Sequence, residues 1–352
     1  MSNRETIFSA GLMSTEVTQV LVINVSRIGD TLLVTPALRA IATAYPNAKV
    51  TVLAHPKRGE ILRHLPFIAN VGGISKARAP WLGRFGGKSF DIGFVFGFDA
   101  ALVRYGLRVC RRVVAFRQGI ADIDARLDPA VDVPAFQSAH SVLQLLQLPA
   151  ALGIAPAGLR LSYKVADDEA AEARRGLSSS RVAAANPLIG LQVASFPTKA
   201  YRDWPVEHFA SLCERIIARR PNAGFLIFGG TEERQRTEWL AGKLSACAEL
   251  LAGRLSLRET AAMMSLTDLY IGVDTGPTHM MSCFDIPMVA LYHGFSRSEL
   301  IAPLQHPCLY AIDHPRAGPD CPIEAPMSEI DVDTVLAKVE QALDEHPRSA
   351  RR

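Results

Sequence analysis

The chain has 352 residues, 49% of them hydrophobic and 21% charged, which is enough for sizeable cores and more than one ordinary domain usually holds. The starting expectation is therefore two domains. Its 38 basic and 35 acidic residues give a formal net charge of +3, far from the balance of a nucleic-acid-binding protein, so we expect no nucleic acid partner. A weak attraction to an anionic membrane surface is compatible with this charge.

Cysteine spacing and hydropathy indicate a cytoplasmic protein. The six cysteines form no C-x-x-C pair and have no metal-ligand spacing, so we interpret them as reduced thiols. No apolar run reaches the roughly 18 residues that cross a bilayer, and residues 1–19 lack the basic start and apolar core of a signal peptide. We therefore expect a protein of the cytoplasm that contacts a membrane at most from its surface.

In the first half of the chain, short apolar runs alternate with helical patterns such as residues 31–45. Four of the runs are expected to be strands: residues 20–25, 49–54, 91–96 and 112–116. This alternation is typical of a parallel sheet with helices on both faces.

A second series of the same kind begins near Leu188. Its expected strands are residues 188–193, 224–230, 269–273 and 288–293, and its helices include 206–219 and 257–265. A polar, small-residue stretch between the two series predicts a short helix and linker. The restart predicts two α/β domains, residues 1–170 and 186–325, followed by a C-terminal helix and basic tail, residues 326–352. Ligands of open α/β sheets bind at the carboxyl ends of the strands, so substrates should bind between the domains.

The stretch "INVSRIGDTLLVTPAL" at residues 23–38 passes from a strand directly into a helix, with Asp30 on the first turn. Two interpretations stay open: the carboxylate caps the helix, worth about 1 kcal/mol, or it is a general base in the cleft, worth roughly 100-fold to 10,000-fold in rate. Only Gly29 follows the strand, so the G-x-G-x-x-G fingerprint is missing. Its absence argues against a nicotinamide oxidoreductase.

The stretch "GVDTGPTHMMS" at residues 272–282 is a second strand-to-helix turn. Thr275, Gly276 and Thr278 would offer amides and hydroxyls at a positive helix end, which can hold a phosphate without a metal. In the alternative interpretation, Asp274 only caps the helix and His279 packs within it.

Two further turns of the second domain carry charged residues. In "VASFPTKAYRDWPVEHF" at residues 193–209, Lys199 and Arg202 precede a helix, and "FGGTEERQR" at residues 228–236 places Glu232 where it could accept hydrogen bonds from a ribose. A solvated loop and ordinary first-turn carboxylates are the alternatives. Because these turns all lie at the carboxyl ends of strands, together they predict a diphosphate site.

These stretches resemble the lipopolysaccharide core heptosyltransferases of glycosyltransferase family 9. The resemblance runs in order from "INVSRIGDTLLVTPALRAIATAYPNAKVTVLAHP" through "WPVEHFASL" and "FLIFGGTEE" to "GRLSLRETAAMMSLTDLYIGVDTGPTHMMSCFDIPMVALYHG", over most of residues 20–295. It implies a GT-B fold, with two Rossmann-like domains facing a central cleft and a C-terminal helix that crosses back to the N-terminal domain. The N-terminal domain would bind the acceptor, and the C-terminal domain would bind ADP-heptose as donor substrate.

The resemblance also implies roles for individual residues. Asp30 would deprotonate the acceptor hydroxyl, and transfer would invert the anomeric centre without a metal or another cofactor. Arg202 stands where the family usually carries Lys and would hold the diphosphate, with part of its charge neutralised by Asp203. The other donor-binding residues would be Lys199, Glu232, Asp274, Thr275, Gly276 and His279; for Lys199, contact with the acceptor or with water stays open.

The acceptor side, residues 56–139, matches the family least. A lipid-anchored anionic saccharide would suit the basic residues Lys57, Arg58 and Arg63, although a solvated helix face is the alternative. We expect an inverting, metal-independent transferase that moves heptose from ADP-L-glycero-D-manno-heptose to a lipopolysaccharide core hydroxyl, at the inner face of the inner membrane. The alternatives are the same fold with another nucleotide sugar or acceptor, and a non-catalytic nucleotide-sugar binding protein.

Overall fold

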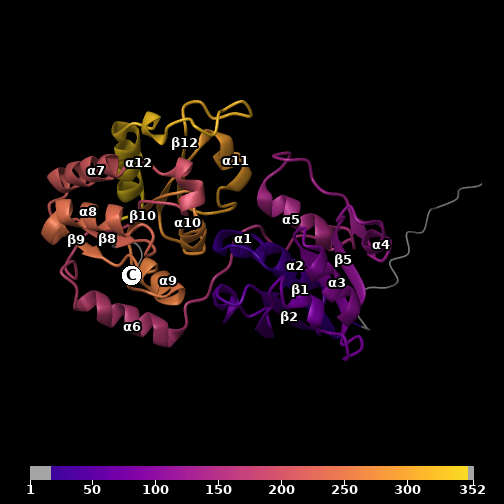
Figure 1. The fold of residues 1–352 in the computed structure, drawn as a ribbon. Coiled ribbons are helices and arrows are strands. Elements are labelled where there is room, and N and C mark those ends of the chain that lie inside the picture. The colour runs from indigo at the N-terminus through magenta and orange to yellow at the C-terminus, as the bar shows by residue number, and fades with distance from the viewer. Residues whose placement is uncertain (1–16, 348–352) are drawn as a thin grey trace, which may run out of the picture.

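The computed structural model describes residues 17–347 and contains two domains, each built on a six-stranded parallel sheet (Figure 1). The two sheets have the same topology, with strand orders β3-β2-β1-β4-β5-β6 and β9-β8-β7-β10-β11-β12. This is the doubly wound Rossmann order, in which the chain returns to the middle of the sheet after its third strand. The prediction of two α/β domains is confirmed.

The first domain packs helices on both faces of its sheet. Its strands are β1 (Gln19–Asn24), β2 (Lys49–Ala54), β3 (Asn70–Gly73), β4 (Phe90–Phe96), β5 (Cys110–Phe116) and β6 (Ala130–Val131). Its helices are α1 (Ile28–Leu33), α2 (Thr35–Ala44), α3 (Ala100–Val109), α4 (Ala121–Asp124) and α5 (Ser141–Ala150), with 3₁₀ turns η1 (Gly59–Leu62) and η2 (Ala79–Trp81). Alternate residues of β1 enter opposite cores, Val20 and Val22 one and Leu21 and Ile23 the other, which is why the strand reads as a continuous apolar run.

The second domain repeats this layering. Its strands are β7 (Leu188–Gln192), β8 (Gly224–Phe228), β9 (Ala248–Leu250), β10 (Leu269–Val273), β11 (Met288–Tyr292) and β12 (Leu309–Asp313). Its helices are α6 (Asp167–Ser178), α7 (Val206–Arg219), α8 (Arg234–Leu244), α9 (Leu257–Met264), α10 (Gly276–Met281), α11 (Ser298–Ile301) and α12 (Val332–Glu345), with 3₁₀ turns η3 (Pro197–Arg202), η4 (Ser245–Cys247), η5 (Gly294–Ser296) and η6 (Met327–Glu329). The eight strands expected from the sequence are all present, while β3, β6, β9 and β12 were not expected because they are short or lack an apolar run.

The expectation that the last helix crosses back to the first domain is wrong. The helix α12 packs against α7, β11 and β12 of its own domain, and Val335, Leu336 and Val339 are fully or almost fully buried in that domain's core. An ion pair at the end of α7 fixes the same position, because Arg220, directly after that helix, contacts Glu340 of α12 at 2.8 Å. Residues 314–331, which include η6, connect β12 to this helix and bring it back against the core of the second domain. Residues 348–352 of the predicted basic tail lie outside the described residues.

The two domains pack directly on each other. One apolar core cluster runs through both of them, joining residues of α2 and α5 to residues of α9 and α10. A buried guanidinium also connects them, since Arg258 of α9 donates to the backbone carbonyls of Glu60 at 3.0 Å and Lys164 at 2.8 Å and pairs with Glu169. Within residues 17–347, no helix is long and apolar enough to span a membrane.

Candidate functional site

Asp30 lies on α1, where the chain leaves the central strand of the first sheet. The helix begins after Arg27, and Thr31 fixes this turn by donating its hydroxyl to the Arg27 carbonyl at 2.7 Å. The Asp30 side chain is exposed and no described residue hydrogen-bonds to it or forms an ion pair with it. The capping interpretation is therefore wrong, and the carboxylate is free to meet a substrate.

Asp274 lies at the matching position of the second domain, where β10 passes into α10, and it is 2% exposed. One carboxylate oxygen lies 2.7 Å from Nη1 of Arg202, and the other lies 3.5 Å from Nε2 of His279. Burial acts to raise the pKa of Asp274, but His279, Arg202 and Lys199 outweigh it, so the pKa lies below its ordinary value. Asp274 thus orients a cation and an imidazole and does not cap α10, whose N-cap is Thr275.

The first turns of α1 and α10 touch across the domain interface. A Cβ atom added to Gly29 would lie 2.8 Å from Cδ2 of His279, and one added to Gly276 would lie 3.0 Å from Cβ of Ile28. Two glycines therefore allow the two turns to approach this closely, since any side chain would separate them. The contact places Asp30 of one domain beside the Asp274 turn of the other.

Arg202 ends the turn η3 and faces both domains. Besides its bond to Asp274, its Nε donates to the hydroxyl of Tyr201 at 3.1 Å. Burial acts to lower the pKa of Arg202, but Asp274, Tyr201 and Asp30 outweigh it and raise the pKa. The guanidinium is thus a fixed positive charge within the electrostatic reach of Asp30.

The structure corrects the expectation that Asp203 neutralises Arg202. Asp203 accepts hydrogen bonds from the backbone and hydroxyl of Ser195, each at 2.6 Å, and forms an ion pair with Arg236. It therefore folds the loop and leaves Arg202 to Asp274. Lys199 is half-buried over the ring of Tyr201, 5.7 Å from its centroid, and no described acid forms an ion pair with it.

Two neighbouring glutamates in the turn after β8 have different contacts. Glu232 is exposed, with no hydrogen bond or ion pair to the described residues, whereas Glu233 accepts from the Gly230 amide at 2.5 Å. Burial raises the pKa of Glu233. Glu233 therefore stabilises the glycine turn, and Glu232 is the glutamate left free for a ligand.

The three cations expected on the acceptor side differ in their surroundings. Arg58 donates from Nη1 to the Ser26 carbonyl at 3.1 Å, directly before the turn that carries Asp30. Lys57 and Arg63 are exposed and form no ion pair within residues 17–347. Of the three, only Arg58 is held against the Asp30 turn.

Some residues of the site were not predicted from the sequence. Arg27 stacks over the Phe196 ring of the other domain, with 5.3 Å between its Cζ and the ring centroid. The Tyr292 hydroxyl at the end of β11 is buried without a hydrogen-bond partner among the described residues, and Asp274 contributes to raising its pKa after burial. Arg27 was visible inside the "VSRIGD" motif, but no spacing rule pairs it with a ring some 170 positions away.

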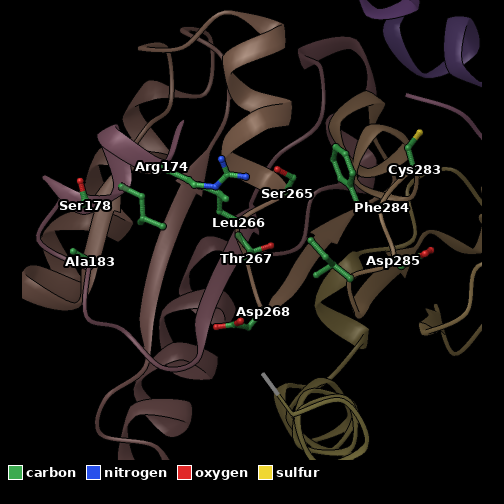
Figure 2. A pocket seen from close by; sticks show the side chains of 12 residues that line it. Arg174, Ser178, Ala183, Ser265, Leu266, Thr267, Asp268, Cys283, Phe284 and Asp285 are labelled. Carbon is green, nitrogen blue, oxygen red and sulfur yellow. The ribbon is translucent and has the colours of Figure 1, made fainter. Parts of the chain in front are cut away.

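A groove of about 990 Å³ lies elsewhere on the second domain. Figure 2 shows its wall, formed by α6 and by the residues that precede β10 and β11, such as Thr267 and Phe284. This is the amino-terminal edge of the second sheet, opposite to the Asp274 turn, so it is not the candidate site. In the part of the chain that the structure describes, no three His, Cys, Asp or Glu side chains are grouped to hold a metal ion.

Comparisons with known proteins agree with this geometry. Residues 89–321 match glycosyltransferase family 9 (heptosyltransferase). Lipopolysaccharide heptosyltransferase 2 of Salmonella typhimurium is 24% identical over 82% of this chain and 86% of its own. The crystal structure of a family 9 glycosyltransferase from Veillonella parvula matches with a TM-score of 0.79 at 18% identity, covering 94% of this chain and 99% of that one. For E. coli ADP-heptose lps heptosyltransferase II the TM-score is 0.77 at 19% identity, covering 93% and 99%. The fold is thus the GT-B fold of these enzymes, and the chain belongs to glycosyltransferase family 9, the heptosyltransferase family.

Proposed function

We propose that this enzyme transfers heptose from ADP-L-glycero-D-manno-heptose to a hydroxyl of a lipid-anchored lipopolysaccharide core acceptor, with inversion and without a metal. One observation carries the proposal: the unpaired carboxylate of Asp30 faces a fixed guanidinium and a buried acid–imidazole pair across the domain contact. Relatives named as lipopolysaccharide heptosyltransferases support the choice of donor and acceptor.

In the proposed reaction, an oxygen of the acceptor attacks the anomeric carbon while the bond from that carbon to the ADP oxygen breaks. The acceptor proton passes to Asp30, and the electron pair of the broken bond stays on the β-phosphate of ADP. Attack from the side opposite to the leaving group inverts the anomeric centre.

The second domain supplies the charge that ADP needs as it leaves. Arg202 and the half-buried Lys199 would face the diphosphate, whose negative charge grows as the bond breaks, and positioned cations stabilise such charge best in a site with little water. Asp274 keeps Arg202 in place at 2.7 Å. Glu232 would accept hydrogen bonds from the ribose, and Arg58 with Lys57 and Arg63 would attract the anionic acceptor.

The test is ADP release from ADP-heptose with a lipid-free core saccharide, for wild type and Asp30→Asn side by side. The variant should bind the donor normally and lose at least about 100-fold in rate, because a general base contributes 10²–10⁴-fold. The anomeric configuration of the product and turnover in EDTA check inversion and metal independence.

Two other outcomes would contradict the proposed function and favour an alternative. Turnover with a UDP- or GDP-sugar and none with ADP-heptose would point to another donor on the same fold. Donor binding without ADP release for any core acceptor would favour a nucleotide-sugar binding protein.

A further inference from the structure

The first domain carries an exposed aromatic and basic surface along α3, on the side that Figure 1 shows turned away from the second domain. Phe85 is fully exposed, Trp81 is 71% exposed and Phe98 is 63% exposed. We call this surface the α3 face; it consists of Lys76, Arg78, Trp81, Leu82, Arg84, Phe85, Lys88, Phe98 and Arg104. Three exposed aromatic side chains along this helix leave apolar area in water, and exposed apolar area of this kind is typical of interaction sites.

The fold holds these aromatic side chains at the two ends of α3. Near its C-terminal end, the guanidinium of Arg108 donates to the carbonyls of Ala79 at 2.6 Å and Leu82 at 3.1 Å, which fixes the turn carrying Trp81 and Phe85. At its N-terminal end, Phe98 directly precedes Asp99, which caps the helix by accepting from two backbone amides. The fold therefore holds Trp81 and Phe98 at opposite ends of α3, and Phe85 follows the fixed turn at the Trp81 end.

The charge of the α3 face is concentrated and mostly unpaired. Residues 74–90 contain four basic residues and no acidic one, so the formal charge of this segment exceeds the +3 of the whole chain. Lys76 pairs with Asp99 at 3.1 Å and Arg104 with Asp122 at 3.5 Å. Arg78, Arg84 and Lys88 form no ion pair within residues 17–347.

The α3 face reaches the edge of the sheet that carries Asp30. Phe96, the last residue of β4, pairs in register with Asn24, the last residue of β1. Phe98 and the turn from Ser26 to Asp30 therefore leave the sheet at the same edge. If the anchor of a ligand lay in a lipid layer against the α3 face, the ligand would enter the cleft at the end of α3 that carries Phe98.

We propose that the α3 face docks on the surface of an anionic lipid bilayer. Tryptophan and phenylalanine insert at the level of the headgroups, and unpaired Lys and Arg are attracted to anionic lipids. The inference rests on the proposed function in one respect, since it gives a route by which a lipid-anchored acceptor reaches Asp30. The docking itself needs neither donor nor acceptor.

Co-sedimentation of the full chain with vesicles tests the proposal. Vesicles of phosphatidylcholine mixed with phosphatidylglycerol should bind the protein, and vesicles of phosphatidylcholine alone should bind it much less. Arg84→Gln with Lys88→Gln should weaken binding roughly thirtyfold, because each lost cation costs several-fold in affinity. Trp81→Ser with Phe85→Ser should also weaken it, and Arg174→Gln with Arg219→Gln, which removes the same charge from exposed sites of the second domain, should not.

Two results would overturn the docking proposal: failure of the wild type to bind anionic vesicles, or equal binding by the wild type and both α3-face variants. A thermal melt of each variant confirms that it is folded. Turnover of a lipid-free acceptor separates this proposal from the proposed function. If turnover persists while vesicle binding is absent, the docking is wrong and the function stands; if vesicles bind and no acceptor is turned over, the function is wrong and the docking stands.

Discussion

Gly29→Ala should inactivate this enzyme while leaving it folded. The added Cβ atom would lie 2.8 Å from Cδ2 of His279, closer than two carbon atoms approach without displacement. The ring has little room to yield, because His279 is 6% exposed and its Nε2 is held by Asp274. The substitution must therefore shift the ring or separate α1 from α10.

The magnitude follows from the size of that shift. Reaching an ordinary contact of about 3.6 Å requires a displacement of about 0.8 Å, and a misplacement near 1 Å at a reacting centre costs about 100-fold in rate. Stability should change much less, because overpacking of about 1–3 kcal/mol is partly offset by the helix propensity of Ala, about 1 kcal/mol better than Gly.

The assay is ADP release under saturating donor and acceptor, combined with urea unfolding. Gly242→Ala is the matched control, because this glycine lies within α8 and an added Cβ would meet nothing within 4 Å. It should be stabilised by about 0.5–1 kcal/mol and keep full activity. If Gly29→Ala retained activity within about threefold of wild type, the close contact between the two turns would not control catalysis, and the reasoning would fail.

The remaining predictions concern the pair of Asp274 and Arg202. Asp274→Asn should lower the free energy of unfolding by about 3 kcal/mol, since it leaves a buried cation without its partner. Folding lowers the pKa of Asp274, so the stabilisation that its carboxylate provides is complete above about pH 4 and is lost as the pH falls further. The free energies of unfolding of the wild type and the variant should therefore converge in acid. A constant difference between them in urea unfolding from pH 7 to 3 would contradict this. Arg202→Lys should keep the charge but lose the simultaneous bonds to Tyr201 and Asp274, and raise the Kd for ADP-heptose about tenfold by calorimetry. An unchanged Kd would show that the forked geometry is unimportant.

The sequence determined the layers of the fold because central parallel strands are buried on both faces. Such strands must be apolar throughout, so β1, β4, β7 and β10 were visible as apolar runs between helical patterns. Edge strands carry no such requirement. The two residues of β6 and the "NVGG" of β3 are short and only partly buried, so neither run could be recognised locally.

The turns at the carboxyl ends of the strands were equally visible, because a polar residue directly between an apolar strand and a helix is a local signal. Asp30 and Asp274 were found this way. The contacts of these carboxylates could not be predicted from the local sequence. Asp274 binds Arg202 of η3 rather than capping its own helix, and Asp203 binds Ser195 and Arg236 rather than its neighbour Arg202.

Only the tertiary structure decided how the two halves meet. The contact of Gly29 with the His279 turn, the place of α12 on its own domain and the bond from Arg258 to the Glu60 carbonyl all join residues that are distant in the chain. The local sequence of a turn determines which side chains that turn presents. Which turns come together depends on how the two domains pack, and no single segment shows this. The local motifs therefore determined the chemistry available to this protein, and the domain contact decided that these groups face one another.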